Sequence, residues 1–134
     1  MRFSPARGAA THQDRVSQLH LERATARALR VSFPGVEQLR LDLSFDAGEA
    51  ITPAPQTHVL HPAALAYFVF PCPYADCNGR FDLTSAVQAA MQSPAHRSDG
   101  MLECAGLRAG HFPEKRRCQL RLHFIVTATY PQAP

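Results

Sequence analysis

The chain has 134 residues, of which 46% are hydrophobic, and a formal net charge of +3. This length fits one globular domain, and no run of about 18 apolar residues is present that would span a membrane. The arginine-containing N-terminus lacks the apolar segment of a secretory signal, so we expect a cytoplasmic protein whose cysteines stay reduced.

The positive charge is concentrated at the N-terminal end of the chain. Residues 1–33 contain six arginines and two carboxylates, a net charge of +4, whereas the rest of the chain carries a net charge of −1. We therefore expect a basic leader over residues 1–34, disordered or weakly helical, before a single domain over residues 35–134. A basic arm attracts nucleic acid or an acidic partner, although an unstructured leader needs no partner.

Four segments have the pattern of β-strands. Apolar residues alternate with polar ones in residues 38–45 (QLRLDLSF) and, most regularly, in residues 118–130, which is typical of half-buried strands. The continuous apolar run at residues 65–70 (LAYFVF) is typical of a strand covered on both faces. Residues 101–108 complete the set, and residues 46–56 are expected to form a loop.

A short helix is expected between the second and third strands. It covers SAVQAAMQ and ends at Ser93, and Ser85 and Gln88 have the spacing of a capping box. Because the connections between the elements are short, antiparallel pairing is favoured. We predict an α+β fold with an antiparallel sheet of about four strands and the helix on one face.

The chain contains four cysteines, Cys72, Cys77, Cys104 and Cys118. Grouped cysteines in a cytosolic protein favour zinc over disulfides. Zinc bound by four thiolates is tetrahedral and closed, which is the arrangement of structural sites. We therefore predict one structural zinc ion with these four ligands.

The first ligand pair lies on a tight bend. Pro73 fixes a backbone angle directly after Cys72. Asn78 and Gly79 follow Cys77 and are typical of a turn with positive φ. Such a turn can aim backbone N–H groups at the sulfur atoms and offset the charge of the thiolates.

The second pair is expected to lie on a β-hairpin. The midpoint between Cys104 and Cys118 is His111, and Gly110 and Pro113 predict a turn at the same place. Cys104 and Cys118 would then face each other, with Cβ atoms about 4.5–5.5 Å apart.

Three alternatives to a four-cysteine zinc site stay open. Facing cysteines have the reach for a disulfide, and four unligated thiols are also compatible with a core. A histidine such as His111 can replace one cysteine as a ligand. Four residues separate Cys72 from Cys77, which disfavours a thioredoxin-like couple with its two intervening residues.

The segment CPYADCNGRF at residues 72–81, together with Cys104 and Cys118, resembles zinc-ribbon domains. In those domains a cysteine bend and a β-hairpin supply the two ligand pairs. The resemblance implies structural zinc and frequent contacts with nucleic acid or other proteins, but no specific activity. The chain departs from the ribbon pattern in its longer first bend and in the lack of a matching second one.

No enzyme motif accompanies the cysteines. His58, His61, His111 and His123 do not form an H-E-x-x-H motif, and the residues before PCPYADC lack the H-x-E of zinc deaminases. Three acidic residues lie near the cysteines in sequence without forming a carboxylate pair; they are Asp76, Asp82 and Glu103.

The predicted function follows from these patterns. We expect a zinc-binding protein that acts as a binding or adaptor module, with a protein or nucleic acid as partner and no membrane. One alternative is nucleic-acid binding by the basic leader together with residues 115–117 (Lys-Arg-Arg). The other is a zinc-dependent enzyme in which a histidine replaces one thiolate.

Overall fold

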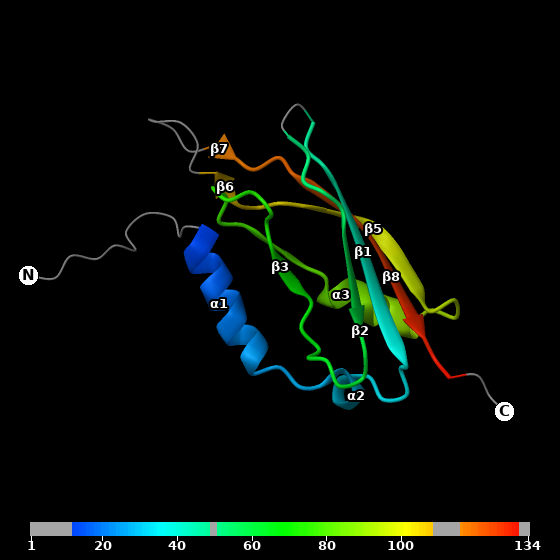
Figure 1. Cartoon of the computed structure of the whole chain (residues 1–134). Coiled ribbons are helices and arrows are strands. Elements are labelled where there is room, and N and C mark those ends of the chain that lie inside the picture. The colour runs from blue at the N-terminus through cyan, green and yellow to red at the C-terminus, as the bar shows by residue number, and fades with distance from the viewer. Residues whose placement is uncertain (1–11, 49–50, 109–115, 132–134) are drawn as a thin grey trace, which may run out of the picture.

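The fold is described from a computed structural model, over residues 12–48, 51–108 and 116–131 (Figure 1). The three helices of this part are α1 (His12–Ala24), α2 (Leu29–Ser32) and α3 (Thr84–Gln92). The strands are β1 (Gln38–Asp46), β2 (Gln56–Leu60), β3 (Val69–Pro71), β4 (Arg80–Asp82), β5 (Arg97–Glu103), β6 (Leu107–Arg108), β7 (Arg116–Arg117) and β8 (Arg121–Thr129).

The largest unit is a four-stranded antiparallel sheet in the order β2-β1-β8-β5. Its two central strands, β1 and β8, pair along their whole length, from Gln38 opposite Thr129 to Asp46 opposite Arg121. The predicted α+β class with a four-stranded antiparallel sheet is therefore confirmed. No described helix is both long enough and apolar enough to cross a membrane.

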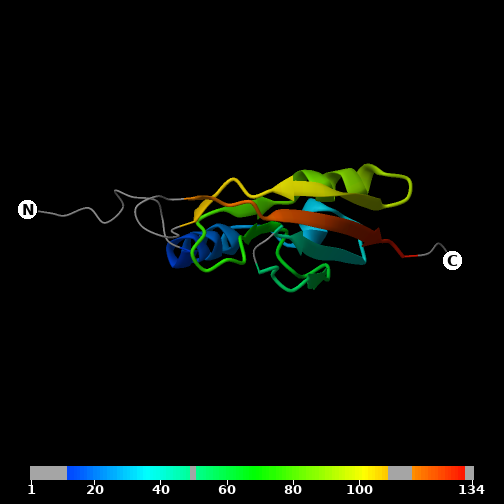
Figure 2. The same ribbon diagram turned by 90° about the horizontal axis from the view of Figure 1, so that it is seen from above.

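The alternation of apolar residues determines which face of the sheet is buried. Along β1 and β8 every second side chain points into the core; these are Leu39, Leu41, Leu43, Leu122, Phe124, Val126 and Ala128. Burying one such aliphatic side chain contributes about 1.5–3 kcal/mol, so this row is a main source of stability. The helix α3 packs on β5 and β8, and α1 lies at the other end of the molecule, beside β3 (Figures 1 and 2).

The second strand of the sheet is not the one that the sequence predicts. Its place is taken by β2, which begins where the expected loop ends. In the apolar run at residues 65–70 only Phe68 is buried, and only the last two residues enter a strand, β3, which pairs with β4 instead. The start of the run bonds to the segment before α2, where the Ala66 N–H donates to the Arg27 carbonyl at 2.7 Å.

The third expected strand is interrupted. Strand β5 begins at Arg97 and ends at Glu103, and the chain then leaves the sheet through Cys104 and Gly106 before it forms β6. The small sheet of β6 and β7 continues the same hairpin beyond this interruption. The break therefore falls at one of the predicted metal ligands.

The predicted capping box at Ser85 and Gln88 is wrong. The helix α3 begins at Thr84, and the N-cap residue, Leu83, has no side-chain hydrogen bond. Instead the carboxylate of Asp82 accepts hydrogen bonds from the Thr84 N–H at 2.9 Å and from the Thr84 hydroxyl at 2.6 Å. Asp82 thus orients the start of this helix.

The helix α1 lies beside β3 and is attached to the rest of the fold by apolar and polar contacts. Leu19 is buried. The carboxylate of Glu22 accepts a hydrogen bond from the Tyr67 hydroxyl at 2.6 Å and forms an ion pair with Arg80 at 3.2 Å. Residues 1–11 of the expected leader lie outside the described residues, and the division at residue 34 stays a prediction.

Candidate metal centre

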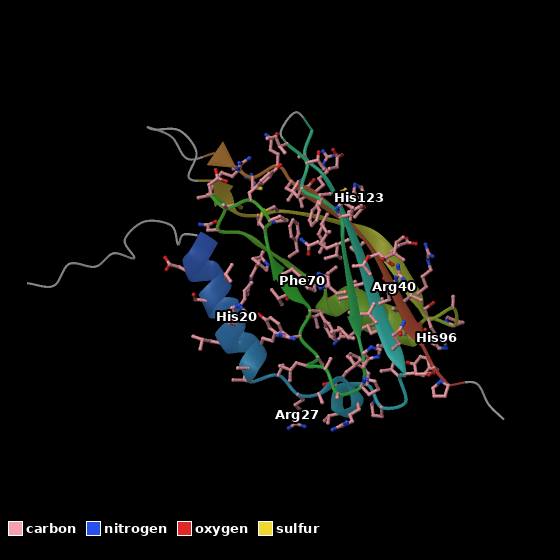
Figure 3. All side chains as sticks on the ribbon, viewed as in Figure 1. His20, Arg27, Arg40, Phe70, His96 and His123 are labelled. Atoms are coloured by element: carbon pink, nitrogen blue, oxygen red, sulfur yellow. The ribbon has the colours of Figure 1, made fainter. Side chains whose placement is uncertain are left out.

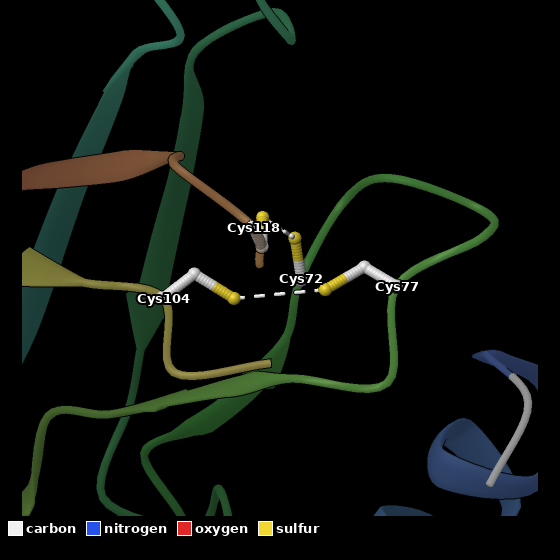
Figure 4. A group of neighbouring side chains, drawn as sticks. All are labelled: Cys72, Cys77, Cys104 and Cys118. Atoms are coloured by element: carbon white, nitrogen blue, oxygen red, sulfur yellow. Dashed lines mark hydrogen bonds between the residues drawn. The ribbon is translucent and has the colours of Figure 1, made fainter. Parts of the chain in front are cut away.

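The four cysteines come together at one end of the main sheet. Cys72 and Cys77 lie in the connection between β3 and β4, Cys104 directly follows β5, and Cys118 directly follows β7. Their sulfur atoms all lie within 4.8 Å of one another, and all four side chains are buried. Figure 4 shows the sulfurs converging from separate stretches of chain. The predicted residues thus form a cluster that can hold a metal ion.

The distances between sulfur atoms fit a tetrahedral ion. The Sγ atoms of Cys72 and Cys118 are 3.8 Å apart, and those of Cys77 and Cys104 are 3.6 Å apart (Figure 4). A zinc–sulfur bond of about 2.3 Å requires tetrahedral edges of about 3.8 Å. A disulfide requires a bond of about 2.05 Å, and all four cysteines are free. The donor set therefore fits a tetrathiolate centre.

The two cysteines of the hairpin do not face each other, because the observed pairing is shifted by two residues from the predicted one. The Cys104 N–H donates to the Leu120 carbonyl at 2.9 Å, and the Cys118 N–H donates to the Gly106 carbonyl at 3.0 Å. Cys104 thus lies opposite Leu120, and Cys118 lies opposite Gly106, in the register that β5, β6, β7 and β8 share. Each hairpin sulfur instead approaches a cysteine of the first bend.

Two copies of the pattern Cys-x-Gly hold one sulfur each. The Gly79 N–H donates to the Cys77 sulfur at 3.3 Å, and the Gly106 N–H donates to the Cys104 sulfur at 3.4 Å. These donors point at the atoms that carry negative charge in a thiolate, which stabilises the ionised form. The expectation of an N–H group aimed at sulfur is confirmed at the Asn78-Gly79 turn, and the Gly106 N–H adds a second such bond.

The glycine carbonyls repeat the same arrangement. The Gly79 carbonyl accepts a hydrogen bond from the Cys72 N–H, and the Gly106 carbonyl accepts one from the Cys118 N–H, both at 3.0 Å. The two cysteine segments therefore have matching hydrogen-bond patterns around one centre. Sequence reasoning missed the role of Gly106, although the repeat of C-N-G at residues 77–79 as C-A-G at residues 104–106 is visible in the sequence.

The two glycines are required by close backbone contact. A Cβ atom on Gly79 would collide with the sulfur of Cys104 and would lie 2.9 Å from the Gly106 Cα. A Cβ atom on Gly106 would lie 2.8 Å from the sulfur of Cys77. The predicted positive φ at Gly79 is wrong, since this residue is not among those with positive φ. Glycine is present because the segments cross, not because the turn is left-handed.

Further contacts connect the two segments. The Leu107 N–H donates to the Asn78 side-chain oxygen at 2.8 Å, and the Asn78 N–H donates to the Leu107 carbonyl at 3.2 Å. The Arg108 guanidinium bonds both carboxylate oxygens of Asp76, at 3.0 and 3.2 Å, and lies 4.0 Å from the centre of the Tyr74 ring. Asp76 therefore lies on the bend and holds the hairpin to it.

The thiols of Cys72 and Cys77 differ in how readily they ionise. Hydrogen bonding with Cys104 and then Cys77, together with burial, raises the pKa of Cys72. Hydrogen bonds from Cys104 and Cys72, with the Gly79 N–H adding to them, lower the pKa of Cys77. The thiol of Cys77 thus ionises readily, whereas that of Cys72 resists ionisation. A cation that replaces the protons is needed to ionise the whole group.

A polar cavity of about 520 Å³ reaches the cluster from the hairpin side. Cys104 and Cys118 form part of its wall, and Asp46, Arg117 and Arg121 lie around them. This cavity supplies an entry path for an ion, which a metal site requires. Residues Cys72 and Cys77 do not line it.

The other candidate residues lie away from the sulfurs. His61 and His123 are exposed, and His58 is half-buried with its ring 4.6 Å from that of Phe70. Burial lowers the pKa of His58. Within the described residues the metal-competent cluster contains cysteines alone.

Of the remaining candidate site residues, two are exposed and two lie outside the residues that the structure describes. Glu103 is exposed at the end of β5, and Arg117 is exposed beside the cavity. Both His111 and Lys115 fall outside the described residues, and Arg116 is described only by its backbone.

Comparisons with known proteins identify no relative. No family model matches the chain, and no curated protein and no solved structure matches it. The cysteine cluster is consistent with a zinc-ribbon-like site, and the resemblance to zinc ribbons rests on that cluster alone.

Proposed function

We propose that this chain is a small zinc-binding protein in which Cys72, Cys77, Cys104 and Cys118 form a structural tetrathiolate centre, and that it acts as a binding or adaptor module. The observation that carries the proposal is the group of four buried sulfur atoms within 4.8 Å of one another, with edge distances of 3.6 and 3.8 Å. These edges match those of a zinc tetrathiolate, about 3.8 Å.

Zinc is favoured by the chemistry of the donors. Thiolates select soft or borderline ions, and a tetrahedral set of four sulfurs is typical of zinc or iron. The N–H groups of Gly79 and Gly106 supply the hydrogen bonds that thiolate ligands need. Because thiolate ligands require reduced cysteines, a tetrathiolate centre favours a reducing compartment such as the cytoplasm.

A structural role is favoured over a catalytic one. Catalytic zinc keeps one position for water, whereas here four thiols are available and each is at most 5% exposed. Zinc would connect two segments that the sequence separates by 26 residues between Cys77 and Cys104. Structural zinc supplies about 10–16 kcal/mol of apparent binding free energy in small peptides, so the fold of this end of the sheet should depend on it.

Metal content and thiol number test the proposal directly. Native mass spectrometry of protein purified without added metal should show one zinc per chain. A thiol count after denaturation with a chelator should give four. X-ray absorption should show four sulfur neighbours, and a single Cys→Ser change should lower both the zinc content and the melting temperature. A quadruple Cys→Ser variant that is metal-free and as stable as the parent would overturn the proposal.

Nucleic-acid binding is the second candidate function, and it draws on the basic leader and residues 115–117. In the described part, exposed Arg27, Arg30 and Arg117 support it. Affinity for DNA or RNA should fall steeply with salt, because bound phosphates release counterions. Affinity that does not change with salt would count against this function. The zinc-enzyme alternative requires a histidine ligand, and four sulfurs by X-ray absorption would exclude it.

A further inference from the structure

A second cavity, which no cysteine lines, lies between α1 and the strands β2 and β3. Its volume is about 330 Å³. Figure 3 shows two residues of its wall, His20 on α1 and Phe70 on β3. Binding sites for small molecules have volumes of about 300–1,000 Å³ and mostly apolar walls. The size of this cavity thus corresponds to a small ligand.

The apolar wall of the cavity is incompletely covered. Among its wall residues only Leu19 is buried, whereas Val16, Leu60, Val69 and Phe70 are half-buried. Apolar area of this kind is stabilised when a ligand removes it from water. The cavity therefore offers a surface that the described part of the chain does not fill.

Polar contacts add to the packing of Leu19 in holding α1 beside this space. The carboxylate of Glu22 binds the Tyr67 hydroxyl and Arg80, at 2.6 and 3.2 Å. These bonds attach the C-terminal half of α1 to residues beside the cavity. Glu22 itself does not line the cavity, although its partner Tyr67 does.

Every polar side chain that lines the cavity is either basic or neutral. His20 and Arg23 of α1 and His58 of β2 contribute nitrogen atoms, and no carboxylate is among the lining residues. His58 already shares a hydrogen bond with Gln56 at 3.0 Å and packs on Phe70. Arginine binds a carboxylate through two parallel hydrogen bonds. The charge of the cavity is thus complementary to an anionic group.

We propose that this cavity binds a small amphipathic carboxylate, with its apolar body against Leu60 and Phe70 and its carboxylate at Arg23 and His20. At about 30 Å³ for each water-sized group, the cavity holds about ten non-hydrogen atoms, which is the size of octanoate. The inference is independent of the cysteine centre.

Calorimetric titration of the full-length protein with octanoate tests the proposal, with 1-octanol as the uncharged control. Octanoate should bind in a 1:1 ratio, and 1-octanol should bind at least tenfold more weakly. Arg23→Gln should weaken octanoate binding about fivefold to tenfold, the effect expected for one charge-assisted contact. Arg27→Gln is the matched control, because Arg27 is also exposed but does not line the cavity.

A cavity-filling variant gives a second readout. Leu60→Phe adds volume to the wall and should abolish octanoate binding, while circular dichroism confirms that the sheet is unchanged. Leu21→Phe is its control, since Leu21 is 73% exposed and lies outside the cavity. Three results would overturn the proposal. The first is no octanoate binding at millimolar concentration, and the second is equal binding of octanoate and 1-octanol. The third is a dimer of this protein that covers the cavity and that octanoate does not dissociate.

Discussion

Gly79 and Gly106 cross backbone to backbone at the cysteine cluster, and a Cβ atom on Gly79 would lie 2.9 Å from the Gly106 Cα. Each glycine also donates its N–H to a cysteine sulfur and accepts an N–H from another cysteine in its own segment. The two glycines are therefore hydrogen-bonded to all four cysteines. Their crossing connects the bend between β3 and β4 to the hairpin that leaves β5.

Replacing either glycine by alanine should destabilise this crossing. In Gly79→Ala and Gly106→Ala the new methyl group meets backbone and sulfur atoms, which cannot move without displacing a cysteine. We expect the free energy of unfolding to fall by about 3 kcal/mol, which is at the upper end of the range for overpacked cores. The affinity for the proposed zinc ion should fall as well.

Urea unfolding and competition for zinc with a chromogenic chelator measure the two effects. Ala105→Ser is the control, because residue 105 lies on the same turn but is exposed. If both alanine variants keep the parent's stability and zinc affinity, the crossing has no role in the site.

Removing the Arg108 guanidinium should loosen the hairpin from the bend. In Arg108→Ala the contacts with Asp76 at 3.0 Å and with the Tyr74 ring are lost. Because the ion pair is partly exposed, we expect a loss of only about 1 kcal/mol, with faster release of zinc to a chelator. Arg40→Ala is matched to it, since Arg40 forms an ion pair with Asp42 at 2.9 Å on the main sheet. Equal zinc-release rates in the two variants would contradict this prediction.

The main elements of the sheet were predictable because their pattern depends on local sequence. Leu39, Leu41 and Leu43 alternate with polar residues, and this period of two requires a strand with one buried face. Strand β2 was missed because its five residues include only two apolar ones, Val59 and Leu60. As an edge strand it pairs with β1 alone, so it needs little apolar surface.

The composition of the cysteine site was predictable, but its geometry was not. Four cysteines in one reduced domain indicate a metal site whatever the connection between them. The register of the hairpin is instead the one that β5 and β8 share, and it brings Gly106 next to Gly79, a contact between residues distant in sequence. The midpoint of Cys104 and Cys118 cannot reveal that shared register, and the predicted register was wrong for that reason.

Stability should depend on the protonation of His58. Burial lowers its pKa below the ordinary 6.5, so the unfolded chain binds this proton more readily than the folded one. The contribution of His58 to the free energy of unfolding is therefore complete above pH 6.5. It decreases as the pH falls from 6.5 toward the pKa of His58 in the folded protein. In His58→Gln this part of the pH dependence should disappear.

Urea unfolding between pH 7.5 and 5.5 measures the difference in free energy of unfolding between the variant and the parent. Any pH dependence that comes from the cysteines is the same in both proteins and cancels in this difference. His123→Gln is the control because His123 is exposed on the main sheet. A His58→Gln curve parallel to that of the parent would show that this histidine does not contribute.

Oxidation of the cluster should join cysteines across the two segments. The sulfur pairs at 3.8 and 3.6 Å are Cys72 with Cys118 and Cys77 with Cys104, and both connect the bend to the hairpin. Hydrogen peroxide oxidises two thiols to one disulfide and is itself reduced to two molecules of water. Because a disulfide sulfur is no longer a thiolate ligand, zinc should be released as the bonds form.

Peptide mapping after peroxide treatment identifies the bonds, and a zinc-sensitive dye follows the release. We expect attack to begin at Cys118 or Cys104, because these two cysteines line the polar cavity of about 520 Å³. Cys72–Cys118 and Cys77–Cys104 should be the first products under native conditions, and denatured protein serves as the control with mixed pairings. Predominant Cys72–Cys77 or Cys104–Cys118 bonds in the native protein would contradict the arrangement of sulfurs described above.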